Sequence, residues 1–464
     1  MTHPDFLMRF LRHPAHKQAL FLDRWYTYGE LVQLGGQTAS WLKNHGVAPG
    51  DKVAIQLENS LDLVLAHLGC MALGAVRVPL NSHYRHAELS PILEDSKPKL
   101  VITRDPSQIP PGYPIQTHVD IVGLPDTGTW PVPPEDITCI LFTSGTTGRA
   151  KGTPQTFAMW THNLDALAER WGVREDVRLH LVLPMFHTHG LVLGLHGMLL
   201  AGASARIGAR FDPVIPEPDV TDIYGVPTFY RRWLPVMAQH KDAFSRLRLM
   251  VSGSDGLPAA LSDELFEATG QRILERYGMT ETVIIASNPL VGPRKAGTVG
   301  TPLRGMEVRI EEGEIQVRGA SVFGGYRPRP DPSAFVDGWF RTGDAGEWDA
   351  DGYLRIVGRR KELVIVGGVN VSPAEVEEAL RSVPGVAEIA CCGVSDADLN
   401  EVVAAAVVGD GSVGVDVLEA RLRQQAQELS GLKRPKLYAF VDALPRNAMG
   451  KLQRNRVTKE IFRK

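Results

Sequence analysis

A run of hydroxyl-bearing, glycine and basic residues, ILFTSGTTGRAKGTP at 140–154, stands out for its possible chemistry. The glycines allow close backbone approach to a ligand, the hydroxyls can donate hydrogen bonds, and Arg149 and Lys151 supply positive charge. Together these residue types predict a loop that grips a polyphosphate. The predicted phosphate contacts are Thr143, Ser144, Gly145, Thr146, Thr147, Gly148 and Lys151.

The simplest alternative is a surface turn rich in Gly, Ser and Thr, which is a common feature of proteins. The apolar strand signal just before the loop, PEDITCILFTS, and the two cations after it argue against a mere turn. The loop also differs from the GxxxxGK[ST] pattern of P-loop NTPases, because no lysine follows Gly152 in the required place. We therefore expect a phosphate-binding loop of another type.

The elements that must position this loop alternate between strand and helix signals up to about residue 290. DKVAIQLENS, KLVITRD and DVRLHLVLPMF are typical of strands, whereas LDLVLAHLGCMALGA and LSDELFEATGQRILERYG have helical periodicity. This predicts an α/β fold with layered, largely parallel sheets. Residues 297–349 predict a small antiparallel or barrel-like piece, and the chain beyond Gly358 predicts a small α+β unit. We expect two domains, 1–358 and 359–464.

Composition excludes several classes of protein. With 464 residues, 44% of them apolar and 22% charged, the chain is typical of a soluble globular protein without extended disorder. A net charge of -3 gives no reason to expect nucleic acid or an anionic membrane as partner. The four cysteines form no CxxC pair, which argues against a zinc site. The N-terminus lacks a signal-peptide pattern, so we expect a cytoplasmic monomer or homodimer.

Four further motifs follow the loop in order: YGMTET at 277–282, RTGD at 341–344, GRRKELVIVGGVNVSPAEVE at 358–377 and PRNAMGKLQRN at 445–455. With the loop, they closely resemble the signatures of the adenylate-forming superfamily of acyl-CoA synthetases, adenylation domains and firefly-type luciferases. Five ordered motifs across nearly the full length make chance agreement implausible. The resemblance implies that family's fold, with a small mobile C-terminal domain, and the use of ATP, Mg²⁺ and coenzyme A.

The resemblance also implies roles in a nucleotide site. Thr280 matches a catalytic α-phosphate contact, and Glu281, with Thr147, matches the magnesium-holding position; the bland alternative for Glu281 is a solvated acid at a helix end. Asp344 and Arg359 match contacts to the ribose, whose hydroxyls can donate to an ionised carboxylate. The segment SGSDGLP resembles the family's adenine-binding loop, so the remaining predicted AMP contacts are Gly253, Ser254, Asp255, Tyr277, Gly278 and Met279.

Lys451 in PRNAMGKLQRN is the predicted catalytic lysine. Adenylation brings an anionic carboxylate to the α-phosphate, so a cation is needed where negative charge accumulates. The alternative is a solvated lysine in a basic tail, against which the flanking motif argues. The resemblance further implies a hinge at Lys361 and a channel for the pantetheine arm of coenzyme A at Gly367 and Gly368. Those two glycines also fit an ordinary strand-ending turn.

The runs HTHG, VPTFYRR and SNPLVGPRKAGTVGTP concern the choice of acid, and they resemble malonyl-CoA synthetases. A guanidinium pairs bidentately with a carboxylate, so an arginine in the acyl pocket would select a diacid. The resemblance assigns His187, Arg232 and Arg294 to the second carboxylate. Arg231 and Arg232 are adjacent, so only one of them can point inward from a helix.

We therefore predict an ATP-dependent acyl-CoA synthetase. It would form an acyl-AMP and then an acyl-CoA, from malonate or methylmalonate, and release AMP and pyrophosphate. Three alternatives stay open: a ligase for short or medium-chain monocarboxylates, an enzyme that transfers the acyl group to a carrier protein, and a non-catalytic adenylate-binding scaffold. Retention of the phosphate loop, Glu281 and Lys451 argues against the scaffold.

Overall fold

The computed structural model divides the chain into two compact units. The N-terminal unit comprises Met1–Val308 and Val317–Phe340, and the C-terminal unit comprises Arg309–Gln316 and Arg341–Lys464. The domain boundary after Gly358 stays a prediction. No helix among the described residues is both long enough and apolar enough to cross a membrane. The described residues are 4–131, 136–143, 150–366, 369–396, 398–446 and 452–462.

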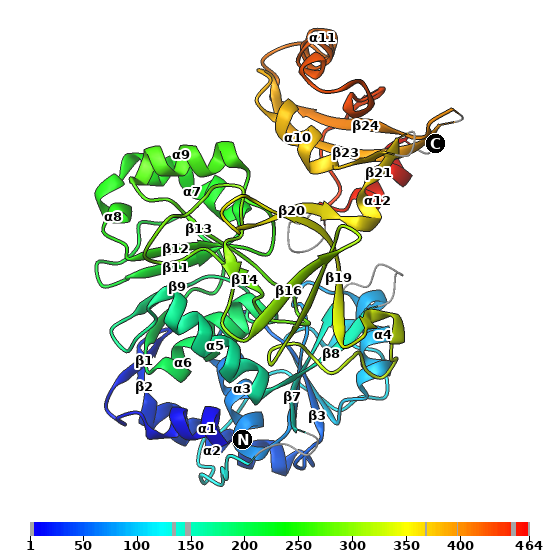
Figure 1. The fold of residues 1–464 in the computed structure, drawn as a ribbon. Helices are drawn as coiled ribbons and strands as arrows, with labels where there is room; N and C mark the ends of the chain where they lie inside the picture. Colours follow the sequence, from blue (N-terminus) through cyan, green and yellow to red (C-terminus); the bar gives the residue numbers. More distant parts are fainter. Residues whose placement is uncertain are drawn as a thin grey trace. The chain divides into compact units, whose positions relative to one another are not determined.

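A nine-stranded sheet in the N-terminal unit has the order β15-β14-β13-β12-β11-β9-β10-β1-β2 (Figure 1). The six strands from β13 to β1 are parallel neighbours, which confirms the predicted parallel α/β architecture. In such sheets, ligands bind beyond the carboxyl ends of the strands. The strands are β1 (Gln18–Phe21), β2 (Trp25–Thr27), β9 (Arg178–Leu181), β10 (Ser204–Ile207), β11 (Asp222–Gly225), β12 (Leu249–Ser252), β13 (Leu274–Tyr277), β14 (Ala286–Ser287) and β15 (Thr301–Pro302).

Three helices, α7 (Pro227–Gln239), α8 (Lys241–Ser245) and α9 (Ala259–Thr269), cover one face of this sheet in Figure 1. Trp233 and Phe244 are fully buried in a cluster that includes Ile223 of β11. Burial of apolar side chains of this size contributes about 1.5–3 kcal/mol each. This packing fixes the strands whose carboxyl ends carry the predicted acid-binding and adenine-binding segments.

The end of α9 differs from the sequence prediction. Helical periodicity predicted one helix through the whole of LSDELFEATGQRILERYG, but α9 ends at Thr269 and β13 begins at Leu274. Gly270 has φ of 75°, a left-handed conformation that favours glycine and ends helices. The last residues of the run therefore form a parallel strand, which leads directly into the YGMTET motif.

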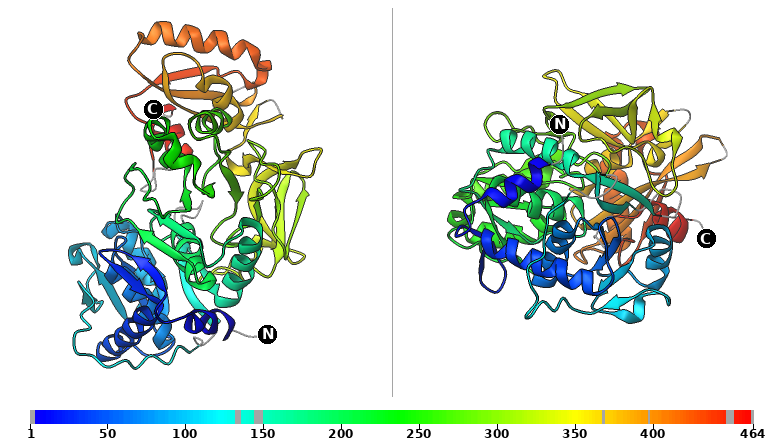
Figure 2. Two further views of the ribbon diagram at one scale, coloured as in Figure 1. Left: turned by 90° about the vertical axis from the view of Figure 1, so that its left-hand side faces the viewer. Right: turned by 90° about the horizontal axis from the view of Figure 1, so that it is seen from below.

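A six-stranded sheet in the same unit has the order β6-β5-β3-β4-β7-β8 and is parallel except for β8. Among the helices, α1 lies beside α5 and α6 (Figure 2). These elements are β3 (Lys52–Gln56), β4 (Val76–Pro79), β5 (Leu100–Thr103), β6 (Ile115–Gln116), β7 (Ile137–Thr143), β8 (Lys151–Thr156), α1 (Pro4–Arg12), α2 (Tyr28–Asn44), α3 (Leu61–Leu73), α4 (His86–Ser96), α5 (Phe157–Trp171) and α6 (Gly197–Ala201).

Two five-stranded sheets complete the fold. One has the order β16-β17-β19-β18 with β20 beside β19, and it confirms the predicted small barrel-like piece. The other lies in the C-terminal unit, has the order β22-β21-β24-β23 with β25 beside β24, and packs with α10 around buried Leu380 and Cys391. Their elements are β16 (Met306–Glu311), β17 (Glu314–Gly319), β18 (Phe335–Val336), β19 (Trp339–Trp348), β20 (Leu354–Arg359), β21 (Val364–Val366), β22 (Val369–Val371), β23 (Val386–Asp396), β24 (Asn400–Gly409), β25 (Leu437–Phe440), α10 (Pro373–Arg381), α11 (Val415–Gln425) and α12 (Arg454–Arg456).

A buried arginine in β4 ties the N-terminal unit together. Arg77 is fully buried, donates through Nε and Nη2 to the carbonyl and hydroxyl of Thr138, and lies 2.8 Å through Nη1 from His196 Nε2. Since arginine can only donate, His196 must accept and therefore be neutral. Burial and then Arg77 lower the pKa of both His196 and His67 well below the usual range. His67 and His196 therefore stay unprotonated in the folded protein at pH values at which an unfolded chain would protonate them.

These two neutral histidines predict that the folded protein loses stability as the pH falls. Below about pH 6.5 the unfolded chain protonates both histidines while the folded chain does not, so stability falls as pH falls, by at most about 1.4 kcal/mol per histidine per pH unit. Calorimetry between pH 7.5 and 5.5 should show a falling melting temperature. His67→Leu should weaken that fall, whereas His240→Gln, at an exposed position, should not. Parallel pH profiles for both variants would contradict the assignment.

Candidate active site

The two ends of the predicted phosphate loop are held side by side. β7 ends at Thr143 and β8 begins at Lys151, and the two residues pair in antiparallel register. Lys151 Nζ forms a 2.7 Å ion pair with Asp331 Oδ2, and this hydrogen bond lowers the pKa of the Asp331 carboxyl. The lysine is 27% exposed, so an incoming phosphate could compete for it. The predicted contacts Ser144, Gly145, Thr146, Thr147 and Gly148 lie outside the described residues.

The YGMTET motif forms a tight turn directly after β13. A side chain at Gly278 would put its Cβ 2.0 Å from the Val283 carbonyl oxygen, so only glycine fits there. Val283 itself has φ of 60°, which β-branched residues rarely adopt and which is typical of functional sites when it occurs. The turn is supported from β8, because buried Gln155 donates to the Thr280 carbonyl at 2.8 Å. Tyr277, Gly278, Met279 and Thr280 are all half-buried.

Glu281 is the buried carboxylate of this turn. It is 4% exposed, and Tyr326 Oη donates to its Oε1 at 2.8 Å. Among the described residues there is no group of three or more His, Cys, Asp or Glu side chains that could hold a metal ion alone. Magnesium commonly takes one or two carboxylates together with phosphate oxygens and water. Glu281 therefore fits a magnesium ion that arrives with a polyphosphate.

Buried polar atoms gather at the carboxyl ends of β9, β11, β12 and β13. Arg276, 6% exposed, has no ion-pair partner among the described residues, and its Nη2 donates to Ser254 Oγ at 3.4 Å. His189 Nδ1 lies 3.4 Å from the same oxygen, and the His189 ring stacks on the Tyr224 ring with their centroids 6.2 Å apart. We call these four residues the Arg276 cluster. Atoms here that lack a hydrogen-bond partner in the described part of the chain are His187 Nε2, Thr188 Oγ1, His189 Nε2, Tyr224 Oη, Ser252 Oγ and Arg276 Nε.

The electrostatics of the Arg276 cluster favour an anion. Burial lowers the pKa of Arg276 to about 9, so the guanidinium keeps its charge at pH 7. Burial, and then Arg276, lower the pKa of His189 well below the usual range, and burial lowers the pKa of His187 to about 4. Both imidazoles are therefore neutral at pH 7. A single buried positive charge among neutral polar groups is costly unless an anion pairs with it.

The two arginines predicted to contact the acid, Arg232 and Arg294, are not members of the Arg276 cluster. Arg232 is exposed on α7, and its contact with the acid stays a prediction. Arg294 is half-buried, but its guanidinium already donates to the carbonyls of Pro289, Arg272 and Leu290 at 3.1, 2.7 and 2.8 Å. Only His187 lies in a segment that contributes to the Arg276 cluster. The motifs did not point to Arg276, although this arginine immediately precedes the YGMTET motif, which begins at Tyr277.

The predicted adenine loop follows β12. Gly253 leaves room for Arg276, because a Cβ there would lie 2.3 Å from Arg276 Nε. Ser254 has φ of 68°, and Ser254 and Asp255 are exposed. The loop thus combines a buried contact to the Arg276 cluster with groups open to a ligand.

Predicted residues of the C-terminal unit fall into two groups. Asp344, 4% exposed, pairs through Oδ1 with Arg359 Nε at 2.9 Å, so the two predicted ribose contacts lie together on β19 and β20. Arg454 forms an ion pair with buried Glu377 and a 3.2 Å contact with Glu362. These contacts anchor the chain close to the predicted lysine and hinge. Lys451, Gly367 and Gly368 lie outside the described residues, and the hinge role of Lys361 stays a prediction.

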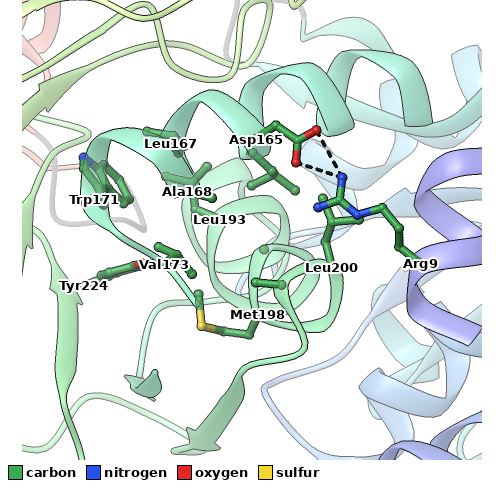
Figure 3. A pocket seen from close by; sticks show the side chains of 13 residues that line it. Arg9, Asp165, Leu167, Ala168, Trp171, Val173, Leu193, Met198, Leu200 and Tyr224 are labelled. Carbon is green, nitrogen blue, oxygen red and sulfur yellow. Dashed lines mark hydrogen bonds and ion pairs between the residues drawn. The ribbon is translucent and has the colours of Figure 1, made fainter. Parts of the chain in front are cut away.

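Figure 3 shows a separate cavity, of about 20 Å³, lined by aliphatic and aromatic side chains of α5, α6 and their neighbours. An ion pair of 2.8 Å between Arg9 and Asp165 lies at its edge. The volume suits about one water molecule. This cavity is therefore no candidate for the site of a nucleotide or an acid.

Comparisons with known proteins find relatives over most of the chain. A family model described as AMP-binding enzyme matches residues 8–327, and one described as AMP-binding enzyme C-terminal domain matches residues 375–451. A malonate–CoA ligase of Arabidopsis thaliana is 33% identical, covering 92% of this chain and 81% of that protein. A 2-succinylbenzoate–CoA ligase of Bacillus licheniformis is 34% identical, covering 98% of this chain and 100% of that protein.

Solved structures show the same likeness. The crystal structure of ATP-bound MatB from Rhodopseudomonas palustris matches with a TM-score of 0.92 and 35% identity over 100% of both chains. The o-succinylbenzoate coenzyme A synthetase of Bacillus subtilis, in complex with ATP and a magnesium ion, matches with a TM-score of 0.87 and 30% identity, over 98% of this chain and 99% of that one. Related proteins of this fold thus hold ATP and magnesium.

The tight YGMTET turn yields a prediction. Gly278→Ala should lower acid-dependent pyrophosphate release at least about 100-fold, because its Cβ would displace the Val283 backbone and the turn that carries Thr280 and Glu281. Gly414→Ala, at the start of α11, is the matched control, since a Cβ there meets nothing within 4 Å. Equal rates for the two variants would show that the turn does not take part in the reaction.

Proposed function

The chain belongs to the AMP-binding enzyme family, and we propose that it activates malonate with ATP and transfers the malonyl group to coenzyme A. At the coarser level it is an AMP-forming acid–thiol ligase, as its family matches and the CoA ligases among its relatives show. The choice of malonate rests on the Arg276 cluster, in which a buried guanidinium has no anionic partner among the described residues.

The proposed nucleotide site uses the residues predicted from the sequence. The loop between Thr143 and Lys151 would bind the phosphates, Thr280 the α-phosphate, and Asp344 with Arg359 the ribose. The position of Lys151 at the start of β8 and the backbone support of Thr280 from the same strand favour this assignment. A magnesium ion held by Glu281 would neutralise charge on the phosphates.

The proposed acid site pairs the distal carboxylate of malonate with Arg276. The guanidinium Nε and the Ser252 and Tyr224 hydroxyls lack partners among the described residues, so a carboxylate could accept from them. Some relatives are consistent with a diacid: ligases named for 2-succinylbenzoate, oxalate (Arabidopsis thaliana, 34% identical) and malonate take acids with two carboxyl groups, whereas an equally similar ligase of Rhodococcus jostii is named for a substituted propanoyl group. A monocarboxylate would leave Arg276 buried and uncompensated, which disfavours that alternative.

The reaction follows in two steps. A malonate oxygen bonds to the α-phosphorus of ATP, the bond from that phosphorus to the bridging oxygen breaks, and pyrophosphate leaves. The coenzyme A sulfur then bonds to the acyl carbon, AMP leaves, and the thiol proton passes to solvent. Lys451 would stabilise the charge of the first step, and a turn at Lys361 would bring Gly367 and Gly368 to the site for the second.

A pyrophosphate-release assay over mono- and dicarboxylic acids tests this function. With magnesium and ATP, we expect the highest specificity constant for malonate, and release of AMP with formation of malonyl-CoA only when coenzyme A is present. Higher activity on butyrate or octanoate would remove the diacid proposal. Transfer of the acyl group to a carrier protein but not to coenzyme A would favour the carrier-protein alternative. If no acid led to release of pyrophosphate, only the non-catalytic adenylate-binding scaffold would remain.

Arg276→Met should raise the Michaelis constant for malonate at least about 30-fold and that for ATP less than threefold, because the variant removes one partner of a buried charge pair worth about 2 kcal/mol or more. Arg294→Ala is the matched control. Its guanidinium binds backbone carbonyls, so the constant for malonate should change little at equal folded fraction. A larger rise of the Michaelis constant for malonate in Arg294→Ala than in Arg276→Met would assign the distal carboxylate to Arg294 instead.

Lys451→Ala should lower the rate of adenylation by about 100-fold or more, since the variant removes a cation from the charge that builds up at the α-phosphate. Thioester formation from supplied malonyl-AMP should stay within about threefold of the wild-type rate. Rapid-quench measurements of the two half-reactions separate these effects. An equal loss in both would mean that the lysine has another role.

A further inference from the structure

The segment 323–327 lies against both halves of the proposed phosphate site. Phe323 N donates to the Glu281 carbonyl at 2.8 Å, and Arg327 N donates to the Gly152 carbonyl at 2.9 Å. A Cβ at Gly152 would lie 2.4 Å from the Arg327 carbonyl oxygen, so a glycine after Lys151 is what permits this approach. The segment is therefore held by backbone bonds to the turn of Glu281 and to the first residues of β8.

Tyr326 lies between these two anchors and contacts a charged group on each side. Its hydroxyl donates to Glu281 Oε1 at 2.8 Å, and Lys151 Nζ lies 4.7 Å from the centroid of its ring. The ring also packs on Phe323, with centroids 4.8 Å apart. One side chain thus bridges the lysine of the phosphate loop and the buried carboxylate proposed to meet the metal.

We propose that Tyr326 is a positioning residue that orients the Glu281 carboxylate for a magnesium-bound nucleotide. A hydrogen bond from a neutral hydroxyl leaves the charge on an ionised carboxylate and fixes the direction in which its oxygens point. Glu281 is buried, so without this donor the orientation of its carboxylate would lose support. The proposal rests on the proposed function only in taking a magnesium nucleotide as the ligand of Glu281.

Tyr326→Phe tests the proposal, because it keeps the ring beneath Lys151 and deletes only the hydroxyl. Calorimetric titration with ATP plus excess Mg²⁺, and with ATP plus EDTA, measures binding without turnover. We expect the variant to bind Mg·ATP about tenfold more weakly or worse, which is the usual effect of one hydrogen bond to a charged group. Metal-free ATP should bind within twofold of wild type. The magnesium concentration for half-maximal adenylation should rise in parallel, and thioester formation from malonyl-AMP should not change.

The matched control is Tyr438→Phe in β25, whose hydroxyl is buried without a hydrogen-bond partner among the described residues. It should leave both affinities at the wild-type values. Equal weakening of Mg·ATP and metal-free ATP in Tyr326→Phe would indicate a general structural role and overturn the proposal, as would no change in either. Wild-type ATP binding that does not respond to magnesium would overturn the metal role of Glu281 itself, which is a distinguishable failure of the proposed function.

Discussion

A positive charge, buried without a counter-ion among the described residues, dominates the electrostatics at the carboxyl ends of the parallel strands. Arg276 is 6% exposed and, within the described part of the chain, donates one long side-chain hydrogen bond, to Ser254. Burial of an unpaired ion costs several kcal/mol, so a fold keeps such a group only where the rest of the structure sustains it or a ligand compensates it. The neutral His189 beside it adds polarity without competing charge. An organic anion is the partner that this environment favours.

The parallel sheet explains why this cation and the nucleotide motifs come together. β12 leads into the predicted adenine loop, β13 carries Arg276 and leads into the YGMTET turn, and both strands end at the same edge. Gln155 of β8 supports this motif by donating a hydrogen bond to the Thr280 carbonyl, and β8 itself begins at the end of the phosphate loop. An acid bound at Arg276 would therefore meet the nucleotide without any large rearrangement of the N-terminal unit.

The sequence predicted the parallel α/β architecture well, because strand periodicity is a local signal, whereas the contacts of the phosphate loop stay a prediction. It misplaced the end of α9, since the apolar spacing of ILERY fits a helix as well as a strand, although Gly270 marked the stop. It named Arg232 and Arg294 for the acid and passed over Arg276, because a sequence shows which residues are arginine but not where their side chains point. Burial of Arg276 follows from strand packing, and the hydrogen bond between Tyr326 and Glu281 joins positions far apart in the chain.

The most direct measurement is a crystal structure with a non-hydrolysable malonyl-adenylate analogue. We expect the distal carboxylate of the analogue within about 2.7–3.1 Å of the Arg276 guanidinium, with the phosphate beside Thr280. A distal carboxylate that points to solvent, or that pairs with Arg294 while Arg276 stays unpaired, would rule out Arg276 as the partner of the acid.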